Sequence, residues 1–223
     1  MAHFILDTAI EDKDWDELFV IDWKSFRNTP EIAALFPGGL DPTKRAANAE
    51  GLKRGVFGGP TERAYAKLSE VQSGQVTAFI SCRVYRGPKG IIDGLFAEEP
   101  PPVQLHFIQD EEDRAFSEWY WNRINDLMRS CKELQVPHIY IQALATDPEW
   151  HRQGAATMLI EWILDFAAKE KIGRCALQAS PWPSSIGLYE KFGFRVIDEH
   201  TSIDEDRFPG RVGTPIKTMI KDL

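Results

Sequence analysis

The sequence predicts a mixed α/β or α+β fold with a partly parallel central sheet. Strand-like and helical stretches alternate over residues 137–191, and two further strand-like stretches, Phe194–Ile203 and Pro215–Leu223, close the chain. Alternation of strands and helices is typical of parallel βαβ units, whereas successive strands usually pair antiparallel. With 223 residues, 43% of them hydrophobic, the chain suffices for one sizeable core and is marginal for two. We therefore treat residues 1–223 as one domain.

The first half of the chain contains the less regular elements. A short strand is expected over His3–Ala9, followed by a helix over Asp12–Phe26, where large apolar side chains recur at helical spacing. Two strands, Ala64–Val71 and Gln75–Tyr85, are joined by a short polar link that favours a hairpin. Glycines and a run of three prolines make residues 86–110 irregular, which indicates an insertion or a lid, with disorder as the alternative.

The second half of the chain has stronger periodicity. Residues His138–Thr146 are predicted to form a central strand buried on both faces, with Ile139, Ile141 and Ala143 on one side. The helix that follows carries a buried stripe formed by Leu159, Ile163, Phe166 and Ala167. A short strand, Cys175–Ala179, and a short helix, Pro183–Lys191, come next.

Composition excludes several classes of protein. The formal net charge of −8 disfavours binding to nucleic acid or to an anionic membrane, although acidity also serves solubility. Cys82, Cys131 and Cys175 are few and widely spaced, so neither a zinc site nor a disulfide framework is expected. The sequence lacks a signal-peptide pattern and an apolar run of the ~20 residues that a transmembrane helix needs. A cytoplasmic protein without a metal is therefore expected.

The most informative segment joins the predicted central strand to the next helix. Asp147–Trp150 reads as a turn, and His151-Arg152-Gln153-Gly154-Ala155-Ala156 opens the helix with small residues. The N–H groups of a first helical turn lack internal partners and favour an anion, which a glycine allows to approach closely. A tightly packed first turn is the structural alternative. Neither GxxxxGK[ST] nor GxGxxG occurs, so the two familiar nucleotide loops are not predicted.

Two motifs carry a resemblance to a known family. Leu144–Leu159 resembles the acetyl-CoA signature Q/R-x-x-G-x-G/A of the GNAT superfamily of N-acetyltransferases, with His151 where the family prefers Gln or Arg. Ser184–Asp198 is similar to the family's C-terminal A-x-x-L-Y-x-K-x-G-F element, and Leu177–Pro183 is similar to fungal-type members. The matching residues of the C-terminal element are Leu188, Tyr189, Lys191, Gly193 and Phe194.

The resemblance implies a central, mostly antiparallel mixed sheet that is splayed at the acetyl-CoA site and flanked by helices. It also implies that Tyr189 is the general acid that protonates the departing thiolate. No residue is assigned as the general base; His138 reads as a structural histidine. The residues implied to contact acetyl-CoA are Leu144, Ala145, Thr146, His151, Arg152, Gln153, Gly154, Ala155, Ala156, Thr157 and Ser180.

Three functions remain open at this stage. The first is an acetyl-CoA-dependent N-acetyltransferase that acts on a primary amine of a small molecule, as a monomer or homodimer. The second is a protein acetyltransferase for lysines or N-termini, and the third is a non-catalytic acyl-CoA sensor. Residues Phe19–Phe36, the Arg86–Gln109 segment and the hairpin near Val212 are expected to set the choice of acceptor, and the acidic balance mildly favours a cationic one.

Overall fold

The computed structural model describes most of the chain. The described residues are 3–29, 32, 39–46, 49, 62–87, 108, 110–180, 183–201, 203–211 and 213–223. Most of the predicted 86–110 insertion therefore lies outside the described residues.

Seven strands form one mixed sheet in the order β1-β2-β3-β4-β5-β7-β6. Every neighbouring pair is antiparallel except β4 and β5, which are parallel. This arrangement confirms the expected mixed, mostly antiparallel sheet. The elements are β1 (Phe4–Asp7), α1 (Asp14–Phe26), β2 (Glu62–Glu70), β3 (Val76–Tyr85), α5 (Glu111–Ser130), a 3-10 turn (Lys132–Leu134), β4 (His138–Thr146), a second 3-10 turn (Pro148–Trp150), α6 (Ala155–Lys169), β5 (Arg174–Ala179), α7 (Pro183–Lys191), β6 (Arg195–Thr201) and β7 (Pro215–Asp222).

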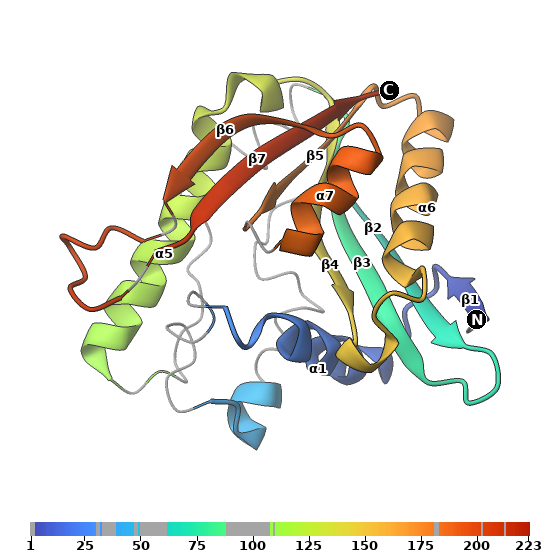
Figure 1. Ribbon diagram of the computed structural model, residues 1–223, viewed down its shortest axis with the longest axis horizontal. Coiled ribbons are helices and arrows are strands. Elements are labelled where there is room, and N and C mark those ends of the chain that lie inside the picture. The colour runs from blue at the N-terminus through green and yellow to red at the C-terminus, as the bar shows by residue number, and fades with distance from the viewer. Residues whose placement is uncertain are drawn as a thin grey trace.

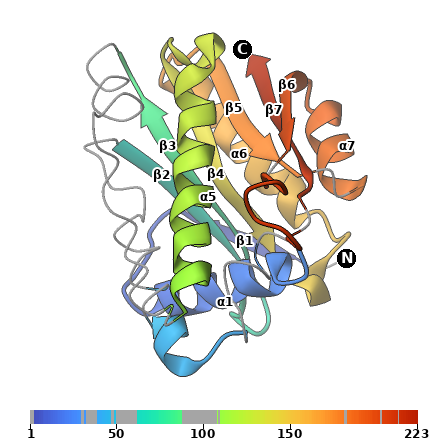
Figure 2. The same cartoon turned by 90° about the vertical axis from the view of Figure 1, so that its left-hand side faces the viewer.

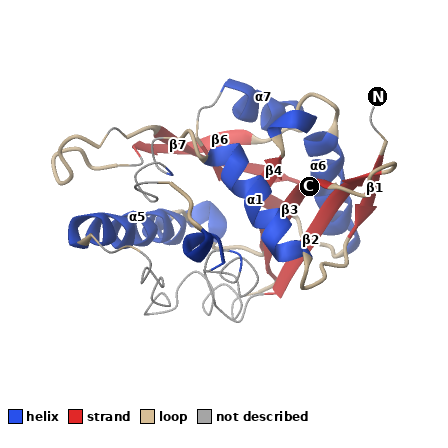
Figure 3. Cartoon of the chain, turned by 90° about the horizontal axis from the view of Figure 1, so that it is seen from below, coloured by secondary structure: helices blue, strands red, loops and turns tan. Residues whose placement is uncertain are grey.

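Helices cover both faces of the sheet. Helices α6 and α7 pack on one face, and α1 and α5 lie on the other, as the side view and the view from below show (Figures 1, 2 and 3). The apolar core divides in the same way. One buried cluster joins α6 and α7 to β2–β5, and separate clusters join α5 and α1 to the opposite face. None of the described helices is both long enough and apolar enough to cross a membrane.

Strand β4 is central, as predicted, but a bulge interrupts it. Residues after the bulge point to the opposite face from the one that strict alternation predicts. Ser81 of β3 pairs with Ala143, whereas the next residue, Cys82, pairs with Ile141. Gln142 is therefore an extra residue, and it interrupts the strict alternation of the strand. The prediction that Ala143 shares a face with Ile141 was wrong. Ile141 packs beneath α6, whereas Ala143 packs with the cluster beneath α1.

Helices α5 and α6 illustrate how sequence pattern sets local structure. Asp110 caps α5, because its carboxylate accepts a hydrogen bond of 2.9 Å from the Asp113 N–H. In α6, Leu159, Ile163 and Ala167 are buried as expected. Phe166 packs against the same core cluster but is only half-buried, and it stacks on the Trp162 ring. The buried residues that the prediction omitted are Ala155 and Ile160.

Candidate active site

The central feature of the site is a split between the two parallel strands. Strands β4 and β5 pair at Ile139–Cys175, Tyr140–Ala176 and Ile141–Leu177, and no later pair forms. Both strands continue past this point, β4 to Thr146 and β5 to Ala179. The split begins at the Gln142 bulge, which turns β4 away from its neighbour. The sheet is thus splayed in the region where the sequence places the cofactor.

Main-chain directions beyond the bulge follow from one hydrogen bond. The Asp147 N–H donates to the Thr77 carbonyl at 2.8 Å, so the main chain of Asp147 faces β3. Because the polar groups of an antiparallel strand alternate in direction, Ala145 also faces β3, whereas Leu144 and Thr146 face the split. Of Leu144, Ala145 and Thr146, which the resemblance implies to contact acetyl-CoA, Leu144 and Thr146 therefore direct their main chain toward the split.

Helix α6 begins just beyond the end of β4 with an open N-terminus. Gly154 occupies the cap position with a φ of 94°, in the left-handed region that glycine adopts without strain, and no side chain caps the helix. A Cβ at this position would meet nothing within 4 Å. The neighbouring Arg152 also has a positive φ, of 60°. The predicted loop residues His151–Gly154 are all exposed, so the first-turn N–H groups are open to a ligand.

Three side chains hold the loop between β4 and α6 in place. His151 places its Nε2 2.9 Å from the Thr146 carbonyl oxygen, which also accepts a hydrogen bond of 3.0 Å from the Ser25 hydroxyl of α1. Lys24 pairs at 2.6 Å with the buried carboxylate of Asp147. His151 departs from the family's residue at this position, and its ring here ties the loop back to the strand.

Tyr189 lies on α7 and is buried, with 8% of its surface exposed. Its ring packs edge-on against Phe194, with ring centroids 5.8 Å apart. Burial raises the pKa of the Tyr189 hydroxyl well above its ordinary value of 10, and the Cys82 thiol adds to the effect. The hydroxyl therefore keeps its proton at neutral pH, and its raised pKa makes it a weaker acid than an exposed tyrosine.

The α1 and α5 face of the split carries a polar cluster. Buried Arg83 donates from its Nε to Gln142 Oε1 at 3.2 Å, and the Tyr140 hydroxyl donates to Gln178 Oε1 at the same distance. The second of these bonds spans β4 and β5 next to the split. The buried Nε2 of Gln178 has no hydrogen-bond partner among the described residues. An unpaired buried donor is costly, so the Gln178 amide carries an unsatisfied hydrogen-bonding group beside the split.

His138 behaves as the structural histidine that the sequence predicts. It is fully buried, stacks on Tyr85 with ring centroids 4.7 Å apart, and places Nδ1 2.8 Å from the Val136 carbonyl oxygen. The pKa of His138 is lowered to about 4, mainly by burial; the hydrogen bond to Val136 opposes the shift and the charge of Arg174 adds to it. The imidazole is therefore neutral throughout the physiological pH range.

Sequence reasoning missed Asp22, the one acid in the middle of the apolar stretch of α1. Its neighbours one turn away on the same side are Leu18, Phe19 and Phe26. Burial alone raises the pKa of its carboxyl from 3.8 to about 7, although part of the side chain reaches solvent. The signal in the sequence was an acid inside an apolar helical stripe.

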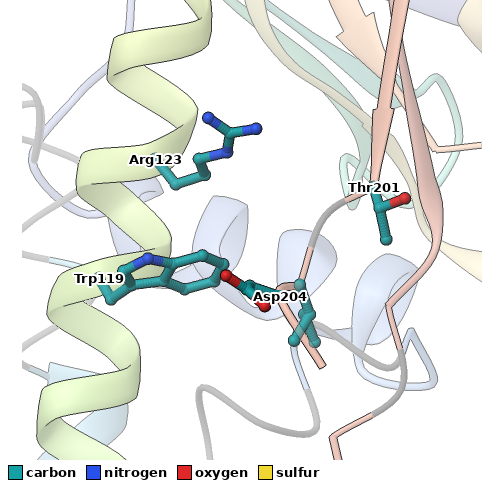
Figure 4. Close-up of a pocket in the computed structure, with 5 residues that line it drawn as sticks. Trp119, Arg123, Thr201 and Asp204 are labelled. Atoms are coloured by element: carbon teal, nitrogen blue, oxygen red, sulfur yellow. The ribbon is translucent and has the colours of Figure 1, made fainter. Parts of the chain in front are cut away.

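A cleft of about 440 Å³ lies between α5 and the segment after β6. Figure 4 shows Trp119 and Arg123 on α5 facing Thr201 and Asp204 across it; Ile203 completes the lining. This segment belongs to the β6–β7 connection that the sequence predicts to influence acceptor choice.

The remaining predicted contacts lie around the same opening. Ser180 follows the last residue of β5, and its carbonyl accepts a hydrogen bond of 3.0 Å from the Ser185 hydroxyl of α7. Ala156 and Thr157, in the first turn of α6, are half-buried. Within the described part of the chain, no three His, Cys, Asp or Glu side chains gather to hold a metal ion.

Comparison with known proteins connects this geometry to a family. The model of the acetyltransferase (GNAT) family matches residues 96–194, which include the split and the start of α6. The uncharacterized N-acetyltransferase YsnE of Bacillus subtilis is 27% identical over 113 residues, which make up 48% of this chain and 75% of that protein. Over residues 96–194 the chain is similar to the GNAT acetyltransferase family. The expectation of an acetyltransferase enzyme is thereby confirmed, and acetyl-CoA is the donor that GNAT acetyltransferases use.

Solved structures confirm the GNAT fold. The polyamine N-acetyltransferase of Drosophila melanogaster, which forms N-acetylagmatine, has a TM-score of 0.65 at 10% identity and covers 99% of this chain and 100% of its own. The ribosomal-protein-S18-alanine N-acetyltransferase of Escherichia coli has a TM-score of 0.53 at 14% identity, with 99% and 94% covered. Small-molecule and protein acetyltransferases share this fold, so the fold alone does not select the acceptor.

Proposed function

We propose that this protein transfers the acetyl group of acetyl-CoA to a primary amine of a small molecule by direct attack. One observation carries the proposal. The uncapped start of α6, with Gly154 at a φ of 94°, follows β4 directly after the point where β4 and β5 separate. The start of α6, which suits a diphosphate, therefore adjoins the gap between β4 and β5, which suits an extended chain.

The loop residues fit the chemistry of the cofactor. First-turn N–H groups of α6 and the helix dipole favour a pyrophosphate, and Gly154 leaves the approach open. Arg152 and Gln153 are exposed beside it and add a cation and an amide. The main chain of Leu144 and the N–H of Thr146 face the split, where an extended pantetheine arm pairs as an added strand would. The Thr146 carbonyl is already engaged by Ser25 and His151.

The remaining cofactor contacts follow from proximity to these groups. His151 positions the loop, and the first turn of α6 is formed by Ala155, Ala156 and Thr157. Ser180 follows the end of β5 and borders the split on that side. When bound, acetyl-CoA supplies the thioester that the amine attacks. Tyr189, whose hydroxyl is protonated at neutral pH as any tyrosine hydroxyl is, donates its proton to the sulfur as the C–S bond breaks.

Two features of this chain support a small cationic acceptor. The net charge of −8 favours the approach of cations. The cleft beside α5 has the size of a small-molecule site and presents the Trp119 indole and the Asp204 carboxylate, with the Arg123 guanidinium also in its lining. The Drosophila relative, a polyamine N-acetyltransferase, acts on an acceptor of this class.

Release of free thiol from acetyl-CoA tests the proposal on a panel of amines. The panel contains aliphatic diamines, polyamines, arylalkylamines, aminoglycosides and a lysine-containing peptide. We expect amine-dependent thiol release with at least one small amine. Release with the peptide alone would replace the small-molecule acceptor by a protein. Binding of acetyl-CoA without release for any amine would make the protein a sensor.

A further inference from the structure

The path of α1 over the sheet places Asp22 near the split. At the N-terminal end of α1, Asp14 forms a buried ion pair of 2.5 Å with Lys67 on β2. At the C-terminal end, Ser25 donates a hydrogen bond to the Thr146 carbonyl of β4. Since Lys67 and Thr146 lie on strands at either side of β3, the helix crosses the sheet from β2 to the end of β4.

Two aromatic side chains show which way Asp22 points. Trp15, two turns before Asp22 on the same side of α1, contacts Tyr65 edge-on with ring centroids 5.4 Å apart. Phe26, one turn after Asp22, packs against the apolar cluster that Ala143 borders. This side of α1 therefore faces the cross-strand row that contains Tyr65, Ser81 and Ala143. Ala143 directly follows the Gln142 bulge, where the split opens.

The environment of Asp22 suits a carboxylate that exchanges a proton. The carboxyl is partly buried, and burial is the sole cause of the rise of its pKa to about 7. No charge or hydrogen bond of a described residue contributes to that shift. A carboxylate that is held without a strong partner, at a pKa near the operating pH, is typical of a general base.

We propose that Asp22 is the catalytic base that accepts the proton of the attacking amine. This inference rests on the proposed function. The amine nitrogen forms the new N–C bond while the N–H bond breaks, and the proton moves to the Asp22 carboxylate. The electron pair of the C–S bond leaves on the sulfur, which takes a proton from Tyr189. The α1 and α5 face of the split is then the acceptor side, opposite α6 and α7.

The charged groups on neighbouring elements are engaged elsewhere. Lys24, on the other side of α1, pairs with Asp147 at the end of β4. Among the described residues near α1, Lys67 pairs with Asp14, Arg45 pairs with Asp16, Arg83 is bonded to Gln142, and Lys44 lies near Asp41. The Tyr65 hydroxyl accepts from Arg63, and the Tyr140 hydroxyl donates to Gln178. A pH dependence centred near neutrality is therefore assigned to Asp22.

The test measures the pH profile of kcat/KM for three proteins: the wild type, Asp22→Asn and Asp22→Glu. Glu17→Gln is the matched control, because it removes an exposed carboxylate from the same helix. The substrate is the best amine of the panel. For the wild type we expect activity to fall as the pH decreases through about 7. Asp22→Asn should lose at least about a hundredfold in kcat and lose this acidic limb. Asp22→Glu should keep the limb at a reduced rate.

Calorimetric titration with acetyl-CoA shows whether Asp22→Asn still folds and binds the donor, which we expect at unchanged affinity. An Asp22→Asn kcat within threefold of the wild type, or an unchanged acidic limb, would overturn the role of Asp22 and leave the proposed function intact. A wild type that releases no thiol with any amine would overturn the proposed function and this inference together.

Discussion

Replacing Asp22 by Asn should change the pH dependence of folding stability even without any ligand. Burial raises the pKa of this carboxyl from 3.8 to about 7. The folded state therefore binds more protons than the unfolded state between these two values, and the free energy of unfolding of the wild type falls as the pH rises through them. At 1.36 kcal/mol per pKa unit the full effect is at most about 4 kcal/mol, because solvent at the exposed edge of the side chain reduces it.

Urea denaturation of the wild type and Asp22→Asn measures this effect at about pH 4 and about pH 8. The variant lacks the titrating group, so its stability relative to the wild type should increase by up to about 4 kcal/mol between the two pH values. Glu17→Gln, on the exposed side of α1, should show a nearly constant difference. A difference for Asp22→Asn that stays constant or declines with pH would refute the raised pKa and weaken the assignment of the base. The wild type is expected to lose stability as Asp22 ionises. Such a cost is common for active-site residues, whose function often conflicts with stability.

Two further substitutions test other parts of the account. Tyr189→Phe should retain acetyl-CoA affinity and lose about a hundredfold in turnover, since it removes the proton donor; thiol release measures the loss, and unchanged turnover would remove the acid role. Lys67→Met should destabilise the fold by about 3–5 kcal/mol in urea denaturation, because it leaves the Asp14 carboxylate buried and unpaired. Adding Asp14→Asn should restore part of that loss, and the absence of any restoration would contradict the pairing.

The elements that sequence predicts well are those with a strong hydrophobic period. Strand β4 matches its predicted range, His138–Thr146, and α7 matches Pro183–Lys191. Helix α6 begins where Gly154 ends the loop. In each case local pattern and tertiary burial agree, so periodicity alone locates the element.

The features that sequence reasoning missed depend on contacts between distant segments. The sequence pattern does not reveal the Gln142 bulge, because the strand is predicted to be buried on both faces. The bulge nevertheless reverses the face to which the following residues point. The burial of Tyr189 arises from packing against the sheet, which a motif match does not report. In the sequence, Asp22 is one acid within an apolar helical stripe. Its position near the split follows only from the path of α1 across the sheet.

The binding of acetyl-CoA at the start of α6 tests the central claim most directly. Isothermal titration calorimetry compares the wild type with Gly154→Ala and with Gly74→Ala, a matched control. Both glycines have positive φ, 94° and 69°, and a Cβ at either meets nothing within 4 Å, but Gly74 lies in the β2–β3 hairpin. We predict binding at sub-millimolar acetyl-CoA for the wild type and Gly74→Ala, and affinity at least about tenfold weaker for Gly154→Ala, because its methyl group enters the ligand's approach. The strain of about 1–2 kcal/mol on a side chain at positive φ applies to both variants. Equal affinity of the two variants, or a wild type that does not bind at all, would contradict the account.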